Sequence, residues 1–328
     1  MNALITGGSG LLGSELARWL ISKGQRPVLM DIASPGQRLH GMANFFDFVS
    51  ATFTDRTKLV ETIRQFDIDT LFHLGGMLSV PSEHEPERAL EINALGTYEV
   101  LEAAQATKLN RLIYTSSIAV YGLDLPDAPV DDRCLQRPTS IYGICKSFGE
   151  QMGLYYARRH GLDFRGVRIP SVVAPGCRIA HMSIYNCWTI EEPLKGNPYR
   201  IPVDPSMRCP TIYYKDAVRA LWMLSMAKPE RIQTRVYNLA GQKPFYSAQD
   251  LCDRVRAHIP EADLDFNADE KINTLLGGLA RIDLDDGNAR SEWDWKPAFD
   301  LDTMIEDFTA EFANQSASQK RIERKRSE

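Results

Sequence analysis

The chain has 328 residues, of which 44% are hydrophobic and 25% are charged, and its formal net charge at pH 7 is −5. This composition is typical of a soluble globular protein, and the length favours two lobes sharing one cleft over a single core. The net charge gives no reason to expect nucleic acid as a partner, and no apolar run is long enough to span a bilayer. The six cysteines are scattered without a C-x-x-C pair, so we expect neither a metal site nor a disulfide framework.

The first thirteen residues form the most informative stretch of the chain. An apolar run at residues 3–5 leads into TGGSGLLG at 6–13 and then into an amphipathic segment at 14–20. This order predicts a strand, a glycine turn and a helix. Glycines at 7, 10 and 13 would let backbone N–H groups approach a pyrophosphate at the helix N-terminus.

A second apolar run, residues 27–30, ends in Asp31. This is about the ~20-residue offset at which an acidic residue takes the adenosine ribose hydroxyls in such units. A carboxylate there would repel the 2′-phosphate of NADP, and residues 32–34 offer no arginine to offset the repulsion. The sequence therefore predicts NAD. The alternative is that Asp31 only caps the end of a strand.

The following segments alternate between strand and helix patterns. We expect a strand within residues 44–53, a helix from Asp55 to about residue 63, and a short buried strand at 70–74. Gly75 and Gly76 then leave room for something flat and bulky to lie on the backbone. We interpret His73 as a packed histidine at the end of the strand. A long helix is predicted for 86–107, a strand for 111–117 and a surface loop for 123–138.

A further helix begins near residue 139 and places Tyr142 and Lys146 on one face, because they are four residues apart. A phenol is a poor base at neutral pH, but a fixed ammonium beside it stabilises the phenolate and lowers its pKa toward the working range. Alone, this spacing also occurs by chance as an exposed pair. Together with the glycine turn, Asp31 and a strand ending in Ser116 and Ser117, it indicates an active site.

These residues closely resemble the extended short-chain dehydrogenase/reductase superfamily, which contains nucleotide-sugar epimerases, dehydratases and small-substrate dehydrogenases. The resemblance runs from Met1 to about Trp295. It rests on TGGSGLLG at 6–13, Asp31, HLGG at 73–76, NALGT at 93–97, TSSIAVYG at 115–122, YGICK at 142–146 and YNLAG at 237–241.

The resemblance implies an α/β fold, a Rossmann doubly wound parallel sheet with a smaller, discontinuous substrate-binding lobe. The NAD-binding domain would comprise residues 1–174 and a return segment at 213–241, and the lobe residues 175–212 and 242–312. Residues 313–328 are polar and basic, and we expect a disordered tail there. Trp293 and Trp295 are expected to pack the small lobe.

The resemblance also implies roles for single residues. Tyr142 would be the catalytic base, Lys146 would lower its pKa and hold the nicotinamide ribose, and Ser117 would orient the substrate carbonyl. The implied cofactor-binding residues are Gly7, Gly10, Leu11, Leu12, Gly13, Asp31, Ile32, Phe53, Leu74, Gly75, Gly76, Asn93, Thr115, Tyr142, Lys146 and Ile169. The implied substrate-binding residues are Ser79, Ser116, Ser117, Tyr142, Ser171, Arg178 and His181. The family usually has alanines at positions 75 and 76, so the two glycines would widen the nicotinamide side slightly.

Segments that differ between the branches of this family indicate which branch the chain resembles. Dehydratases carry an Asp-Glu pair after the catalytic hydroxyl, and Ile118 and Ala119 stand there instead, so no acid is available to protonate a leaving hydroxide. The Asn and Arg that hold the diphosphate in nucleotide-sugar epimerases are missing from 168–171 and 209–213. Arg200 or Arg208 could replace them, which keeps a 4-epimerase as an alternative.

Other segments are similar to the bacterial L-threonine 3-dehydrogenase branch, namely 116–122, 208–220 and 286–295, while 191–203 resembles the D-erythronate dehydrogenases. Where the threonine enzymes have an acidic, Gly-Thr-rich segment, this chain has Arg178 and His181, which favour an anionic or polyhydroxy substrate. Both could equally be solvated loop residues.

The resulting hypothesis is an NAD-dependent dehydrogenase that oxidises a secondary alcohol of a small polar substrate, such as a hydroxy acid, a sugar acid or a threonine-like molecule. A second alternative is an NAD-binding regulator without turnover. We further expect a cytoplasmic homodimer, formed by the helix from residue 86 and the helix carrying Tyr142, with neither nucleic acid nor membrane as a partner and no bound metal.

Overall fold

The computed structural model describes residues 1–125, 128–177, 183–279 and 282–327. Its centre is a parallel sheet of seven strands in the order β10-β6-β5-β4-β1-β2-β3. The strands are β1 (Ala3–Thr6), β2 (Val28–Asp31), β3 (Asp47–Ser50), β4 (Thr70–His73), β5 (Arg111–Ser117), β6 (Asp163–Ile169) and β10 (Val236–Asn238). The chain runs outward from β1 to β3 and then returns to β4 on the other side of β1. The predicted doubly wound sheet is confirmed, and its winding reverses between β1 and β4.

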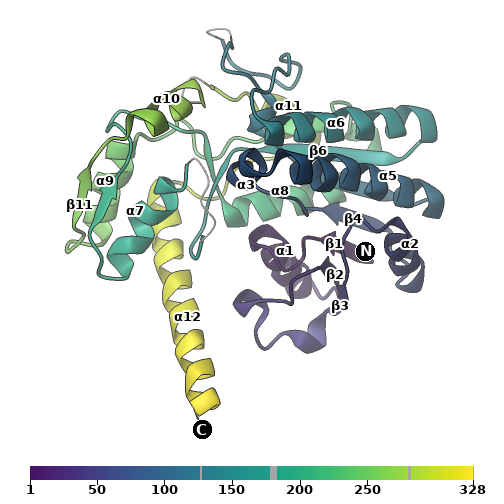
Figure 1. The fold of residues 1–328 in the computed structure, drawn as a ribbon, viewed down its shortest axis with the longest axis horizontal. Helices are drawn as coiled ribbons and strands as arrows, with labels where there is room; N and C mark the ends of the chain where they lie inside the picture. Colours follow the sequence, from purple (N-terminus) through teal and green to yellow (C-terminus); the bar gives the residue numbers. More distant parts are fainter. Residues whose placement is uncertain (126–127, 178–182, 280–281, 328) are drawn as a thin grey trace.

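Helices cover both faces of this sheet (Figure 1). One face carries α1 (Leu11–Ser22), α8 (Tyr214–Met226) and α11 (Gly287–Trp293), and the other carries α2 (Arg56–Gln65), α5 (Gly96–Thr107) and α6 (Ile141–His160). Successive strand residues alternate between the two faces: Leu4 packs with α2 and α5, whereas Ile5 packs with α1 and α8. Both faces are therefore buried, as parallel sheets require.

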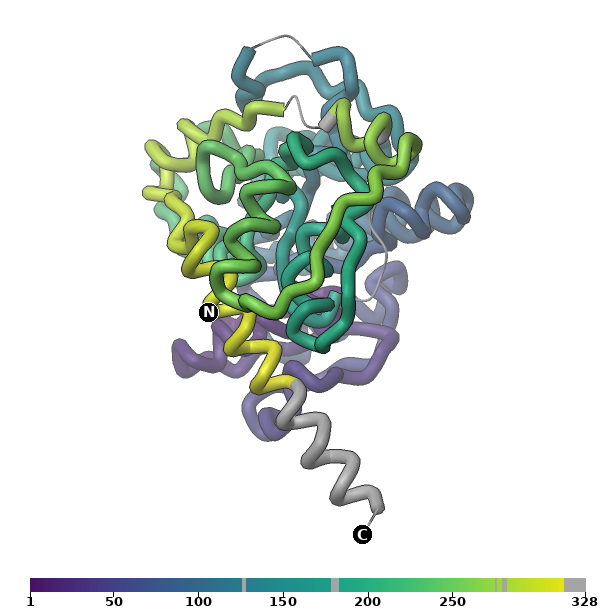
Figure 2. Tube along the Cα trace, turned by 90° about the vertical axis from the view of Figure 1, so that its left-hand side faces the viewer, coloured from purple at the N-terminus to yellow at the C-terminus, as the bar shows by residue number. Residues whose placement is uncertain are grey.

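A second lobe lies beyond the carboxyl ends of the strands (Figures 1 and 2). It has its own core, in which Tyr185, Ile190, Leu251 and Phe308 are buried. Its elements are β8 (Tyr199–Ile201) paired with β11 (Leu264–Phe266), α7 (Tyr185–Leu194), α9 (Ala248–His258), α10 (Glu270–Leu279) and α12 (Leu301–Ser327). A further pair, β7 (Ser171–Val173) and β9 (Thr211–Tyr213), lies where the chain passes between the lobes.

Short elements complete the description: η1 (Gln37–Leu39), η2 (Ala43–Phe45), α3 (Ser79–His84), α4 (Pro86–Ala89), η3 (Leu90–Leu95), η4 (Ile118–Val120) and η5 (Pro229–Arg231). The predicted helix at 86–107 is thus three consecutive pieces, α4, the π-helix η3 and α5. Asp55 caps α2 as expected, accepting a hydrogen bond from the Lys58 N–H at 3.0 Å. Within the described residues, no helix is long and apolar enough to cross a membrane.

Three expectations from the sequence are wrong in part. Trp293 and Trp295 pack in the core of the large domain, where Trp293 stacks edge-on against Tyr237 of β10 with ring centres 5.6 Å apart. The loop at 123–138 is not wholly at the surface, because Val130 and Asp132 are buried. The helix α12 includes the start of the predicted tail, and the Gln315 carbonyl accepts a hydrogen bond from Gln37 at 2.5 Å.

Candidate active site

The glycine turn after β1 has the shape that a pyrophosphate requires. Gly7 has a φ of +70°, and a Cβ added at Gly13 would lie 2.1 Å from the Gly7 carbonyl oxygen, so both positions need glycine. The helix α1 begins at Leu11 with no side-chain cap and no acidic residue in its first turn. Its first N–H groups have no intrahelical acceptor and carry the positive end of the helix dipole. These residues therefore fit an anionic cofactor.

Asp31 lies beside this turn at the end of β2. Its carboxylate accepts hydrogen bonds from the Ser9 N–H and the Ala33 N–H, each at 3.0 Å. The first bond joins the end of β2 to the glycine turn, and the second closes the strand end. The adjacent Ile32 is 76% exposed. Asp31 does cap its strand, as the alternative interpretation held, but it is also held against the loop predicted to bind the phosphates.

His73 is confirmed as a packed residue. It is buried, and its ring nitrogens lie 2.7 Å from the Thr6 hydroxyl and 3.1 Å from the Thr97 hydroxyl. Burial, helped by the nearby Lys146 charge, lowers the pKa of His73 to about 3, so the ring is neutral at physiological pH.

The space beside Gly75 is filled by Phe53. A Cβ added at Gly75 would lie 2.5 Å from the Phe53 ring, and one added at Gly96 would lie 2.7 Å from another edge of the same ring. The ring also lies edge-on to His73 at 4.9 Å. The expectation that this glycine widens the nicotinamide side is therefore wrong, because the room is taken by a side chain of the chain itself.

Asn93 lies on the π-helix η3 and holds the loop after β4. Its amide accepts from the Met77 N–H at 2.7 Å and donates to the Met77 carbonyl at 3.1 Å. This loop runs from Leu74 to α3, which begins at Ser79. Asn93, a predicted cofactor residue, thus fixes the backbone beside the predicted nicotinamide position.

The sheet and α6 bring Tyr142, Lys146 and Ser117 together. Ser140 caps α6 by accepting from the Gly143 N–H at 3.0 Å, which sets the start of the helix just before Tyr142. Ser117 lies near enough to Tyr142 to lower the pKa of the phenol, and the Lys146 Nζ donates to the Thr115 carbonyl at 2.8 Å. The same Nζ lies 5.7 Å from the centre of the Tyr142 ring.

The pKa of Tyr142 does not move in the direction that the spacing predicts. Burial raises the pKa of Tyr142 to about 12, although the nearby Ser117 acts in the opposite direction. Burial also lowers the pKa of Lys146 to about 8. The Lys146 ammonium is directed at the Thr115 carbonyl, so it does not offset the burial of the phenol.

Ser116, the neighbour of Ser117, is buried and donates its hydroxyl proton to Glu150 Oε1 at 2.5 Å. Glu150 is in turn paired with Arg168 of β6, whose Nη2 donates to Oε2 at 2.8 Å. Sequence reasoning missed both charged residues. Two signals could have found them: Glu150 follows Lys146 by one further helical step of four, and Arg168 is a charge inside an otherwise apolar strand.

The predicted substrate residues are only partly placed. Ser171 lies on β7 and is hydrogen-bonded to Ser183. Ile169, which was predicted to contact the cofactor, is buried at the end of β6. Arg178 and His181 lie outside the described residues.

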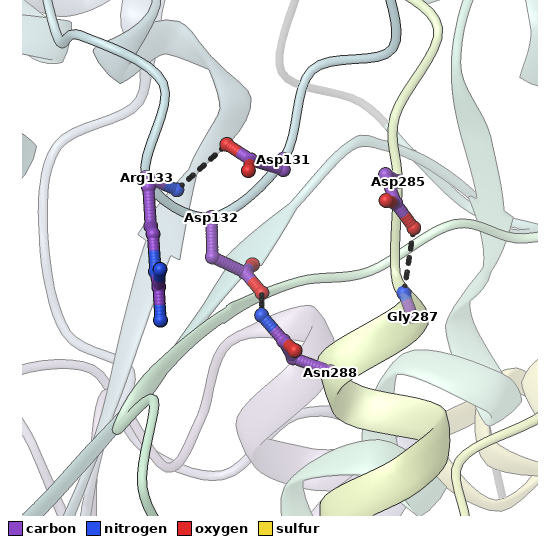
Figure 3. A pocket seen from close by; sticks show the side chains of 6 residues that line it. All are labelled: Asp131, Asp132, Arg133, Asp285, Gly287 and Asn288. Carbon is purple, nitrogen blue, oxygen red and sulfur yellow. Dashed lines mark hydrogen bonds between the residues drawn. The ribbon is translucent and has the colours of Figure 1, made fainter.

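Figure 3 shows a separate pocket of about 290 Å³, lined by Asp131, Asp132, Arg133, Asp285, Gly287 and Asn288. Three of these residues are acidic, and none was predicted for catalysis or binding. The pocket borders the site through Asp132, whose backbone carbonyl accepts from Arg168 at 2.9 Å. Its carboxylate accepts from the Asn288 amide at 3.0 Å. Because none of the residues that line this pocket was predicted for catalysis or binding, we do not assign the substrate to it.

The doubly wound sheet, the open N-terminus of α1, Asp31 and the Tyr142/Lys146 helix define a class: an NAD-dependent oxidoreductase of the extended short-chain dehydrogenase/reductase type. The comparisons agree. The NAD dependent epimerase/dehydratase family matches residues 3–240. The mitochondrial L-threonine 3-dehydrogenase of Bos taurus is 32% identical over 308 residues, covering 92% of this chain and 80% of the relative. The chain belongs to the NAD-dependent epimerase/dehydratase family, and NAD is its cofactor.

Solved structures of related proteins share the fold. A monomeric L-threonine 3-dehydrogenase from a metagenome superimposes with a TM-score of 0.84 at 26% identity, covering 94% of this chain and 98% of the other. A UDP-glucose 4-epimerase from Thermotoga maritima, solved with UDP-glucose, superimposes with a TM-score of 0.82 at 22% identity, covering 97% and 100%. At that identity the second likeness shows the fold alone.

Proposed function

We propose that the protein is an NAD-dependent dehydrogenase that oxidises a secondary alcohol of a small polar substrate: a hydroxy acid, a sugar acid or a threonine-like molecule. The observation that carries this proposal is the grouping of Tyr142, Ser117 and Lys146 at the carboxyl ends of β4 and β5. The relationship to an L-threonine 3-dehydrogenase supports it further.

Each residue has a distinct role in the proposed reaction. When bound, NAD supplies the hydride acceptor. Because its raised pKa keeps Tyr142 protonated in the free protein, the phenol first loses its own proton to solvent. The phenolate then accepts the hydroxyl proton of the substrate, and the Ser117 hydroxyl holds the same oxygen through a hydrogen bond. To stabilise the phenolate as the proton moves, the Lys146 ammonium turns from the Thr115 carbonyl toward the phenol, whose ring centre is 5.7 Å away. Ser117 lies near enough to Tyr142 to act on its pKa, so the substrate oxygen would lie between these two hydroxyls.

Two arginines bear on the size of the substrate. In the sequence, Arg200 and Arg208 are the residues that could replace the diphosphate-binding groups of the epimerases. Arg200 is on β8 in the second lobe, where its Nη1 lies 2.9 Å from Asp263. Arg208 donates to the Phe245 carbonyl. Both guanidinium groups are engaged within the protein, so a diphosphate would have to compete for them. The predicted Arg178 would instead pair with a single carboxylate, which favours hydroxy acids and sugar acids.

A substrate screen tests the proposal. Purified protein with NAD is mixed with L-threonine, erythronate and other hydroxy acids, and reduced cofactor is followed by absorbance. We expect turnover with at least one small hydroxy acid, and Tyr142→Phe should lower the rate at least about 100-fold. Thermal shift with UDP-sugars is the second arm. Stabilisation by a UDP-sugar without cofactor reduction would favour the epimerase, and NAD binding without any turnover would favour the regulator.

We also propose a homodimer built on η3 and α6. Five large apolar side chains on these two helices are between 37% and 56% exposed: Leu90, Leu95, Ile144, Phe148 and Tyr155. On α6 they recur at helical spacing, so they form one outward face. Light scattering should give twice the chain mass, and Ile144→Glu together with Phe148→Glu should give the chain mass. A wild-type monomer over a wide concentration range would contradict the dimer. Such an outcome has a precedent, because the related metagenome enzyme is described as monomeric.

A further inference from the structure

A buried ion pair lies directly behind the catalytic group. Glu150 is 0% exposed and Arg168 is 4% exposed. The guanidinium donates to both carboxylate oxygens, from Nε to Oε1 at 2.9 Å and from Nη2 to Oε2 at 2.8 Å. A buried ion pair is weak support for stability, because removing two charges from water costs about as much as their attraction returns. Its place beside the active site therefore points to another role.

The pair connects the elements that carry the reactive groups. Glu150 is on α6, four residues after Lys146 and eight after Tyr142. Its Oε1 accepts the hydroxyl proton of Ser116, which directly precedes Ser117 on β5. The carboxylate thus joins the helix of the base to the strand end of the substrate-orienting hydroxyl.

The other side of the pair is anchored as well. Arg168 Nη1 donates to the Tyr121 hydroxyl at 2.6 Å and to the Asp132 carbonyl at 2.9 Å. The Tyr121 hydroxyl donates in turn to Asn238 Oδ1 at 2.7 Å. These groups around Arg168 come from β10 and from the segment between η4 and α6, so the carboxylate is held from several directions and cannot move without breaking buried hydrogen bonds.

The charges around Lys146 single out the same carboxylate. Lys146 faces Cys145, Tyr142 and Glu150 on its own helix, Tyr114 from β5 and His73 from β4. Burial raises the pKa of Tyr114, Tyr142 and Cys145 and lowers that of His73, so these four groups are neutral at physiological pH. Among these neighbours, Glu150 is the one carboxylate, and its own partner is the Arg168 guanidinium.

We propose that Glu150 is a positioning residue: anchored by Arg168, it fixes Ser116, and through it Ser117, relative to Tyr142, and it places a carboxylate one turn of α6 from the Lys146 ammonium. This inference rests on the proposed function for its kinetic part only. The electrostatic part concerns the chain itself and can be measured without any substrate.

The first experiment titrates Lys146 in the full-length protein. Lysine side-chain resonances are followed by NMR against pH, and the Lys146 signal is identified by its loss in Lys146→Met. In Glu150→Gln we expect the titration midpoint of Lys146 to fall by about one pH unit, since an attractive negative charge is removed. Glu150→Asp keeps the charge and should restore the midpoint. The control Glu87→Gln, at an exposed position on α4, should leave it unchanged. An unchanged midpoint in Glu150→Gln overturns the electrostatic role.

The second experiment separates positioning from substrate contact. Ser116→Ala removes the link to β5 but leaves Glu150 paired with Arg168, so it tests the proposal even where Glu150→Gln does not fold. We expect kcat to fall between about 10- and 100-fold with KM unchanged, because the reacting groups are misplaced. A raised KM with an unchanged kcat would mean that Ser116 contacts the substrate, and would overturn the positioning role. If no substrate is turned over, the proposed function fails, whereas the Lys146 titration still decides the role of Glu150.

Discussion

Two polar clusters share the helix α6, and they are built in opposite ways. The ion-pair cluster, Glu150 with Arg168 and Ser116, has a partner for each charged group. The catalytic cluster, Tyr142 with Lys146 and Ser117, has few partners, and burial moves the pKa of both titratable groups. The difference shows how one helix can hold, within two turns, a carboxylate with a buried partner and two side chains that are able to exchange a proton. Pairing keeps a buried group in one state, and sparse pairing leaves it able to exchange a proton.

The largest effect should come from breaking the ion-pair cluster. Arg168→Met leaves the Glu150 carboxylate buried without a counter-charge, so the free energy of unfolding should fall by about 3–5 kcal/mol. Denaturant unfolding measures this. Arg26→Met is the matched control: Arg26 and its partner Asp47 are at the surface, so the loss of stability should be much smaller than in Arg168→Met. Equal losses in the two variants would remove the distinction between buried and exposed pairs.

The catalytic cluster should respond in the opposite direction. The pKa of Lys146 is lowered from 10.5 to about 8, so its buried ammonium destabilises the fold below pH 8 and this cost is relieved as the pH rises from 8 to 10.5. Lys146→Met should therefore raise the free energy of unfolding by about 3 kcal/mol at pH 7, while abolishing activity. The gain should shrink toward pH 10.5. Thermal unfolding at several pH values checks it, and a variant less stable than the wild type at pH 7 contradicts it.

A smaller effect is expected at the border of the two clusters. Burial raises the pKa of Asp132 from 3.8 to about 6, against the hydrogen bonds from Asn238 and Asn288. The folded state thus binds a proton that the unfolded state releases, and stability falls as the pH rises from 4 to 6. Relative to Asp132→Asn, the wild type should gain about 2 kcal/mol when the pH is lowered from 6 to 4. Parallel pH–stability curves for the two proteins would exclude this titration.

The sequence predicts the catalytic cluster but not the ion-pair cluster, for a physical reason. The glycine turn and the Tyr142–Lys146 spacing are local, so a single stretch of chain reveals each of them. The partners of Glu150 come from segments between 14 and 34 positions away, and only the folded sheet brings them together. The pKa of Tyr142 was predicted in the wrong direction for the same reason, since burial depends on the whole fold. Trp293 and Trp295 were assigned to the wrong lobe because their spacing does not identify the surface they pack on.

The Phe53 ring between Gly75 and Gly96 has a consequence for the evolution of this family. Because an added Cβ at either glycine would overlap the ring, positions 53, 75 and 96 cannot change independently. Homologues with alanine at position 75 should carry a smaller residue at position 53, and the three columns of an alignment should covary. We therefore expect Phe53 and the two glycines to be inherited together.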